Sequence, residues 1–182
     1  MLAATVVAGA FVALVRAPEQ PTAAYSAASP GIRVVPCGAS IATTAFPYLG
    51  SHRSAGRYRE VLGVVSAPPA YMPQVLPTNH RPWAFWHKQG IVLRATRQTV
   101  TVTVPDAWRR RVAVSWGGIG APTGALRLRG CGSSPDRGIA FAGGFFLRSR
   151  AACVPLVFRV GTRSATVRFG LGRRCRHDGR SS

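Results

Sequence analysis

The stretch that decides the fold is CVPLVFRVGTRSATVRFGLGRRC, residues 153–175, in which two cysteines bracket apolar residues that alternate with polar and basic ones. Four apolar residues share one parity on each side of the turn-like cluster Gly161–Ser164, namely Val154, Leu156, Phe158 and Val160 before it and Ala165, Val167, Phe169 and Leu171 after it. Alternation with a period of two indicates half-buried strands, and two such runs around a short loop predict an antiparallel hairpin. With Gly161–Ser164 as the loop, Val160 pairs with Ala165, and the apolar residues further along also meet apolar residues.

The four cysteines predict two disulfide bonds. An even number of cysteines outside a reducing cytosol favours bridges, and four cysteines allow three connectivities. The pairs that we predict are Cys153–Cys175 and Cys37–Cys131. The first pair requires the second strand of the hairpin to bend back at Gly170 or Gly172. A zinc site is the alternative, but the chain has no CxxC, so its spacing does not fit and we predict no metal site and no cofactor.

Further strand-like runs follow one another from residue 32 onward. QTVTVTVP (residues 98–105) places valines on one face and threonines on the other, and WAFWHKQGIVLRA (residues 83–95) predicts a hairpin around Gln89 and Gly90. Many short strands with Gly/Pro turns predict an all-β fold, a single β-sandwich of Ig-like or jelly-roll-like type over residues 32–176.

Residues 1–17 predict a signal peptide or a membrane-anchor helix. The apolar run Leu2–Val15 would reach about 21 Å as a helix, whereas a hydrocarbon core needs about 30 Å, so its length fits a signal peptide better than a full span. No Lys or Arg precedes the run, and a start further upstream would turn it into an uncleaved anchor. A flexible linker over 18–31 and a disordered tail over 177–182 complete the predicted organisation. We therefore expect an extracellular or cell-surface protein, secreted or anchored in the membrane.

The chain is strongly basic. It holds 24 lysines and arginines against five acidic residues, a formal charge of +19, and Lys88 is its one lysine. A field of this sign attracts polyanions without specificity. The arginine bias has a second explanation, which is a GC-rich genome that supplies arginine wherever a polar surface residue is needed. Hydrophobic residues make up 47% of the chain, which excludes a disordered protein.

Pairs of arginines spaced i, i+2 predict a basic plate on one sheet face, because such residues point to the same side of a strand. The predicted plate consists of Arg57, Arg59, Arg127, Arg129, Arg148, Arg150, Arg159 and Arg168. Guanidinium groups bind phosphates and carboxylates, so the expected partners are anionic polymers of the cell envelope or anionic lipid headgroups. No specific nucleic acid is expected for an exported protein. The alternative is a solvated face whose charges discourage edge-to-edge pairing.

The sequence offers little catalytic chemistry. Nothing in the spacing of the acidic residues pairs them for hydrolysis, no GxSxG elbow occurs, and bridged cysteines offer no thiolate. We therefore expect a non-enzymatic envelope module, structural or weakly binding anionic polymers. One alternative is a carbohydrate-binding domain that uses Trp83 and Trp86, which differ in parity and are expected on opposite faces. The other is an envelope hydrolase that uses His80 or His87 as its base.

Four segments carry a resemblance to a known group. They are VLGVVSAPPAYMPQVL, RPWAFWHKQGIVLRA, VTVPDAWRRRVAVSWG and AGGFFLRSRAACVPLVFRVGTRSATVRFGLGRRC. The chain resembles uncharacterised small exported proteins of actinobacteria over residues 32–176, and the final Cys–hairpin–Cys unit is its most specific part. The resemblance implies an exported β-rich domain and supplies no activity and no catalytic residue.

Overall fold

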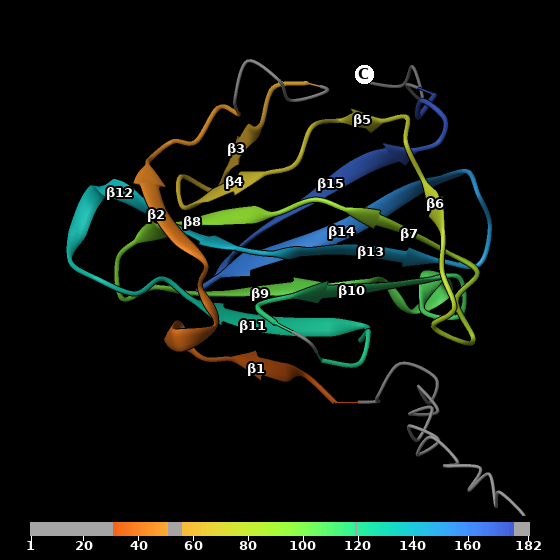
Figure 1. Cartoon of the computed structure of the whole chain (residues 1–182). Helices are drawn as coiled ribbons and strands as arrows, with labels where there is room; N and C mark the ends of the chain where they lie inside the picture. The colour runs from red at the N-terminus through yellow and green to blue at the C-terminus, as the bar shows by residue number, and fades with distance from the viewer. Residues whose placement is uncertain (1–30, 51–55, 119, 177–182) are drawn as a thin grey trace, which may run out of the picture.

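The computed structural model describes residues 31–50, 56–118 and 120–176 (Figure 1). The predicted signal or anchor segment, nearly all of the linker and the C-terminal tail lie outside the described residues. No helix in the described part of the chain is both long and apolar enough to cross a membrane.

Short strands account for most of the regular structure. The strands of the described residues are β1 (Arg33–Val35), β2 (Ala42–Ala45), β3 (Arg59–Val61), β4 (Val65–Ala67), β5 (Tyr71–Met72), β6 (Leu76–Pro77), β7 (Phe85–Lys88), β8 (Ile91–Ala95), β9 (Thr99–Thr103), β10 (Val112–Trp116), β11 (Ala125–Arg129), β12 (Ser134–Phe141), β13 (Gly143–Leu147), β14 (Ala152–Val160) and β15 (Arg163–Leu171). Single 3-10 turns follow β1 and β9, at Cys37–Ala39 and Asp106–Trp108.

One layer of the fold is a six-stranded sheet in the order β1-β11-β9-β14-β15-β5. The other layer consists of the sheets β2-β12-β8-β4-β3 and β10-β13-β7-β6. Two stretches of chain run through both of these sheets, since β7 leads directly into β8 and β12 leads directly into β13 (Figure 1). In one sheet β7 pairs with β13, and in the other β8 pairs with β12. The two smaller sheets are therefore parts of one bent layer.

The core lies between the two layers. Alternate residues of β9, β11 and β14 are fully buried, as the period-two pattern predicts. Phe145 of β13 lies 5.5 Å from the ring of Trp116 in its own layer and 5.3 Å from the ring of Phe169 in the six-stranded sheet, measured between ring centroids. The predicted all-β sandwich is confirmed.

The hairpin of β14 and β15 is confirmed, but the predicted register is wrong by two residues. Val160 pairs with Arg163, and the loop is Gly161–Thr162. Gly161 fills the first position of this two-residue loop with a φ of 57°. A two-residue loop of this kind matches the twist of the paired strands better than a four-residue loop does. A shift of two residues leaves every side chain on its predicted face.

The predicted hairpin around Gln89 and Gly90 is wrong. The backbone N–H of Gln89 donates to the carbonyl of Gly143 at 2.8 Å, and its carbonyl accepts a hydrogen bond from the Trp116 indole at 2.8 Å. Because both backbone groups of Gln89 are held by other strands, the chain continues in extended form from β7 to β8. Glycine at 144 allows this close pairing, since a Cβ there would come within 1.9 Å of the His87 carbonyl oxygen.

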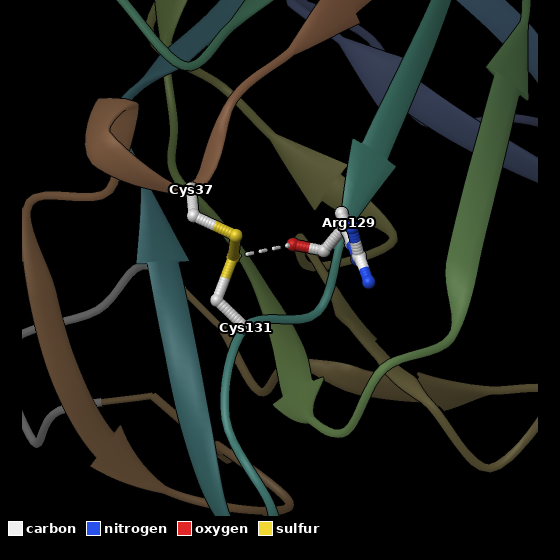
Figure 2. Close-up of a disulfide and its surroundings, with 3 residues drawn as sticks. All are labelled: Cys37, Arg129 and Cys131. Carbon is white, nitrogen blue, oxygen red and sulfur yellow. Dashed lines mark hydrogen bonds between the residues drawn. A yellow bond between two sulfur atoms is a disulfide. The ribbon is translucent and has the colours of Figure 1, made fainter.

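Both predicted disulfides are present. Cys37–Cys131 joins the end of β1 to the chain after β11, and the Cys131 sulfur also contacts the carbonyl oxygen of Arg129 at 3.2 Å (Figure 2). Cys153–Cys175 closes the final hairpin. No described cysteine is free, which indicates an oxidising, extracellular-type environment.

The bend that brings Cys175 back lies at the predicted glycines. Gly172 has a φ of 67°, a conformation that glycine adopts without strain. A Cβ on Gly170 would lie 2.4 Å from the carbonyl oxygen of Arg173, so the returning chain passes directly over Gly170. Residues 173–176 therefore cover the outer side of β15.

Candidate functional site

Half of the predicted basic plate exists. Arg127 and Arg129 of β11, Arg159 of β14 and Arg168 of β15 alternate with buried residues and lie exposed on the outer face of the six-stranded sheet. Thr101 of β9 pairs with Arg127 on one side and with Arg159 on the other. These two arginines therefore stand about 10 Å apart, two strand spacings, on one row. We call these four arginines the basic face.

Arg59 does not belong to the basic face. It begins β3, the edge strand of the other layer, and its side chain reaches across to β15. Its guanidinium donates to the carbonyl of Arg168 at 3.1 Å and lies 5.0 Å from the centroid of the Phe169 ring. Arg57 is exposed and precedes the strand, so the i, i+2 rule does not place it beside Arg59.

Arg148 and Arg150 are also absent from the basic face. They lie in the bend between β13 and β14 rather than on a strand. The guanidinium of Arg148 lies 5.9 Å from the Trp83 ring and that of Arg150 lies 5.7 Å from the Phe85 ring. Each arginine therefore covers a different aromatic side chain, and the two do not form a pair.

The structure gathers arginines in a place that the sequence did not indicate. A hollow of about 540 Å³ opens where β15 meets the edge strand β5. We call it the arginine cleft, and it is lined by Arg59, Ala70, Tyr71, Arg168, Arg174, Cys175 and Arg176. Arg168 belongs to both the basic face and the cleft, so the two regions adjoin.

Local packing holds Arg59 and Arg174 of the cleft in place. The guanidinium of Arg174 lies 4.5 Å from the centroid of the Tyr71 ring, an attractive cation–π arrangement. Burial lowers the pKa of Arg59 from its usual value. Its Nε atom is buried and has no hydrogen-bond partner among the described residues. A buried nitrogen without an acceptor has lost its hydrogen bonds to water, which costs free energy.

Among the described residues, no acidic side chain lines the cleft. Glu60 contacts Arg94 at 3.7 Å, and Asp106 contacts Arg109 at 2.9 Å. Asp136 lies in β12, in the other layer. Neither of these two ion pairs includes a residue that lines the cleft, so no carboxylate among the described lining residues neutralises the positive charge there.

The segment Arg173–Arg176 was missed at the sequence level. It follows the last strand and has no regular period, so no parity rule assigns its side chains to a face. The only sequence signal was the run of basic residues around Cys175, GRRCR. The disulfide turns this signal into a site because it fixes the segment against β15.

Trp83 and Trp86 form one cluster, contrary to the expectation of opposite faces. Both pack with Phe146 and Ala113 on the outer side of the second layer. Trp83 precedes β7 and turns back over the sheet, its backbone N–H donating to the carbonyl of His80 at 2.8 Å, so strand parity does not apply to it. Trp83 is buried, and Trp86 is half-buried against a hollow of about 250 Å³ that Phe146 and His80 also line.

The two candidate histidines are not brought together. The His80 ring stands edge-on to Phe146 at 5.7 Å on the outer side of the layer. His87 pairs with Phe145, on the opposite side, and its Nδ1 lies against the carbonyl of Gln74. Among the described residues no group of three His, Cys, Asp or Glu side chains could hold a metal ion.

No family model and no curated protein matches the chain. What the protein binds is therefore inferred from the chemistry of the arginine cleft and the basic face.

Proposed function

We propose that the protein is a non-enzymatic module of the cell envelope that binds anionic polymers through the arginine cleft and the adjoining basic face. The lining of the cleft carries this proposal. Arg59, Arg168, Arg174 and Arg176 converge on one hollow, and none of its lining residues in the described part of the chain carries a carboxylate. Cations held this close repel one another, and a bound anion relieves that repulsion while accepting charge-assisted hydrogen bonds.

The basic face extends the binding surface. Arg127, Arg129 and Arg159 lead across the outer side of the six-stranded sheet toward Arg168 at the rim of the cleft. A flexible polymer that enters the cleft can lie along these residues. A single small anion cannot reach them from the cleft, so this arrangement supports a polymer as the partner.

The proposed location is the outside of the cell or its surface, secreted or held by residues 1–17. The two disulfides support an oxidising compartment. Acidic polymers and anionic lipid headgroups are the polyanions of such a compartment, and of these we propose the polymers.

The proposal is tested by isothermal titration calorimetry of polyphosphate and polyglutamate at low and high salt. We expect binding that weakens as salt rises. Arg174→Gln/Arg176→Gln should weaken binding at least about tenfold, because charge-assisted hydrogen bonds are lost. The matched control is Arg97→Gln/Arg110→Gln, which removes the same charge from two exposed residues that do not line the cleft.

Equal weakening by both double variants would mean that net charge alone attracts the polymer. Binding that high salt leaves unchanged would exclude an electrostatic site. Binding to vesicles of anionic lipid in preference to either polymer would replace the polymer with a membrane surface.

A second candidate is a carbohydrate site, favoured by one observation. The half-buried ring of Trp86 lines a hollow of about 250 Å³ together with Phe146 and His80. An aromatic wall of this kind can stack on the apolar face of a sugar ring. This candidate predicts binding to neutral glycans that is insensitive to salt and is lost in Trp86→Ala. Trp83 is unsuited to the contact because it is buried.

A further inference from the structure

The arginine cleft has a neighbour. A second hollow, of about 490 Å³, is lined by Cys153, Arg168, Arg173, Arg174 and Arg176. Arg168, Arg174 and Arg176 line both hollows, so the two lie side by side with these arginines at their common boundary. Each hollow also has an arginine of its own, which is Arg59 in the cleft and Arg173 in the second hollow.

The guanidinium groups reach the two hollows from three different elements. Arg59 comes from β3 in the opposite layer and Arg168 from β15, whereas Arg174 belongs to the segment after the bend. Donors that arrive from several directions suit a tetrahedral anion with oxygens on all sides. A carboxylate is planar and accepts its strongest, bidentate hydrogen bonds within one plane.

Two features position the donors before a ligand arrives. Arg59 is held by the carbonyl of Arg168 and by the Phe169 ring, and Arg174 is held by the Tyr71 ring. The Cys153–Cys175 bridge ties the segment that carries Arg173 and Arg174 to β14. Side chains that are already ordered lose less conformational entropy on binding.

We propose that the two hollows are adjoining subsites for successive phosphate groups of one phosphate polymer, with Arg168, Arg174 and Arg176 placed between the two phosphates. This inference deepens the proposed function and depends on it, since it specifies the polymer that the cleft binds. Orthophosphate occupies one subsite at a time, whereas a chain of phosphates occupies both and gains the affinity of the second contact within one complex.

The experiment compares orthophosphate, tripolyphosphate and an oligoglutamate of the same charge as tripolyphosphate, by calorimetry on the disulfide-bonded protein. We expect tripolyphosphate to bind at least about tenfold more tightly than either of the other two. Equal affinity for tripolyphosphate and oligoglutamate would overturn the preference for phosphate. Equal affinity for tripolyphosphate and orthophosphate would overturn the paired subsites.

Variants that change one subsite provide the second arm. Arg173→Gln alters only the second hollow at an exposed residue and is expected to lower tripolyphosphate affinity toward that of orthophosphate while leaving orthophosphate binding in the cleft. Arg59→Gln should lower the affinity for both ligands, and Arg97→Gln is the matched control. If Arg173→Gln leaves tripolyphosphate affinity unchanged, the second subsite does not exist. If neither anionic polymer binds the unmodified protein, the proposed function itself fails, which is a different result.

Discussion

The guanidinium of Arg59 lies 5.0 Å from the centroid of the Phe169 ring, although the two residues belong to opposite layers of the sandwich. The same side chain donates to the carbonyl of Arg168 at 3.1 Å. Arg59 therefore closes the gap between edge strand β3 and strand β15, and it contributes a wall of the arginine cleft. The residue that links the two layers thus also lines the proposed binding site.

Replacing Arg59 with glutamine is expected to lower the free energy of unfolding by about 1–2 kcal/mol. The substitution removes a partly desolvated cation–π contact and a charge-assisted hydrogen bond. Urea denaturation measures the change. Arg57→Gln is the control, because this exposed neighbour should change the free energy by less than about 0.5 kcal/mol. Equal effects of the two variants would show that Arg59 does not join the layers.

Removing the Cys153–Cys175 bridge is expected to reduce both stability and anion affinity. The chain-entropy treatment gives a loss of about 3 kcal/mol for the 22-residue separation, and the fixed position of Arg173–Arg176 is lost as well. Cys153→Ser/Cys175→Ser is the variant, studied by urea denaturation and by tripolyphosphate titration of the folded protein.

The other disulfide supplies the contrast. Cys37→Ser/Cys131→Ser opens a loop with a separation of 94 residues and should cost more, about 4–5 kcal/mol. Its two cysteines line neither hollow, so the tripolyphosphate affinity of the folded protein should stay the same. A loss of affinity in this variant as large as in Cys153→Ser/Cys175→Ser would contradict a local role for the Cys153–Cys175 bridge.

Alternation and glycine content predicted the sandwich and its terminal hairpin well, because burial on one face of a strand is a local property of the sequence. The length of the loop between β14 and β15 was harder to predict from the sequence. Both a two-residue and a four-residue loop keep Val154 and Phe169 on the core side, so hydrophobicity cannot choose between them. The choice depends on the backbone of Gly161.

The site was harder to predict than the fold. Parity correctly placed Arg127 and Arg159, which lie within strands, but it cannot tell that β3 is an edge strand whose Arg59 turns across the sandwich. Parity also assigns no face to Arg173–Arg176, because that segment lies outside the strands and is held in place by the Cys153–Cys175 disulfide. Long-range pairing likewise decided against the hairpin at Gln89.

Tyr58 is expected to titrate at higher pH than an ordinary tyrosine. Burial raises its pKa, an effect partly opposed by the hydrogen bond from Gln89, and its hydroxyl donates to the carbonyl of Gly90 at 3.0 Å. Because the pKa of Tyr58 is higher in the folded protein, its neutral hydroxyl adds to the free energy of unfolding. This contribution is fully present below the unfolded-state pKa of about 10 and is lost as pH rises through the folded-state pKa.

Ultraviolet absorbance at alkaline pH measures this titration. We expect a late phase for one of the four tyrosines that is missing in Tyr58→Phe. Tyr71→Phe is the control and should retain the late phase. A titration in which all tyrosines ionise together in the folded protein would contradict the burial of the Tyr58 hydroxyl.

Gly144 is expected to tolerate no side chain. A Cβ there would lie 1.9 Å from the carbonyl oxygen of His87 in the paired strand β7, so Gly144→Ala must force the two strands apart. We expect a loss of at least about 2–3 kcal/mol in the free energy of unfolding by urea. Gly38→Ala is the matched control, since a Cβ at Gly38 meets nothing within 4 Å. Similar free energies for both variants would refute the close approach of β7 and β13.

The bridge between Cys37 and Cys131 also sets how the domain responds to mechanical force. Strand β1 lies at the edge of its sheet and pairs only with β11 among the described strands, so a pull on the chain at Gly31 would detach β1 first. Detachment must stop at Cys37, because a covalent bond ties that residue to the chain after β11 (Figure 2). Beyond this point the tension passes into Cys131 and the neighbouring β11, which is hydrogen-bonded to β9. The disulfide thus works as a mechanical stop, and a domain tethered through its N-terminal side would keep its arginine cleft, at the far edge of the same sheet, intact under load.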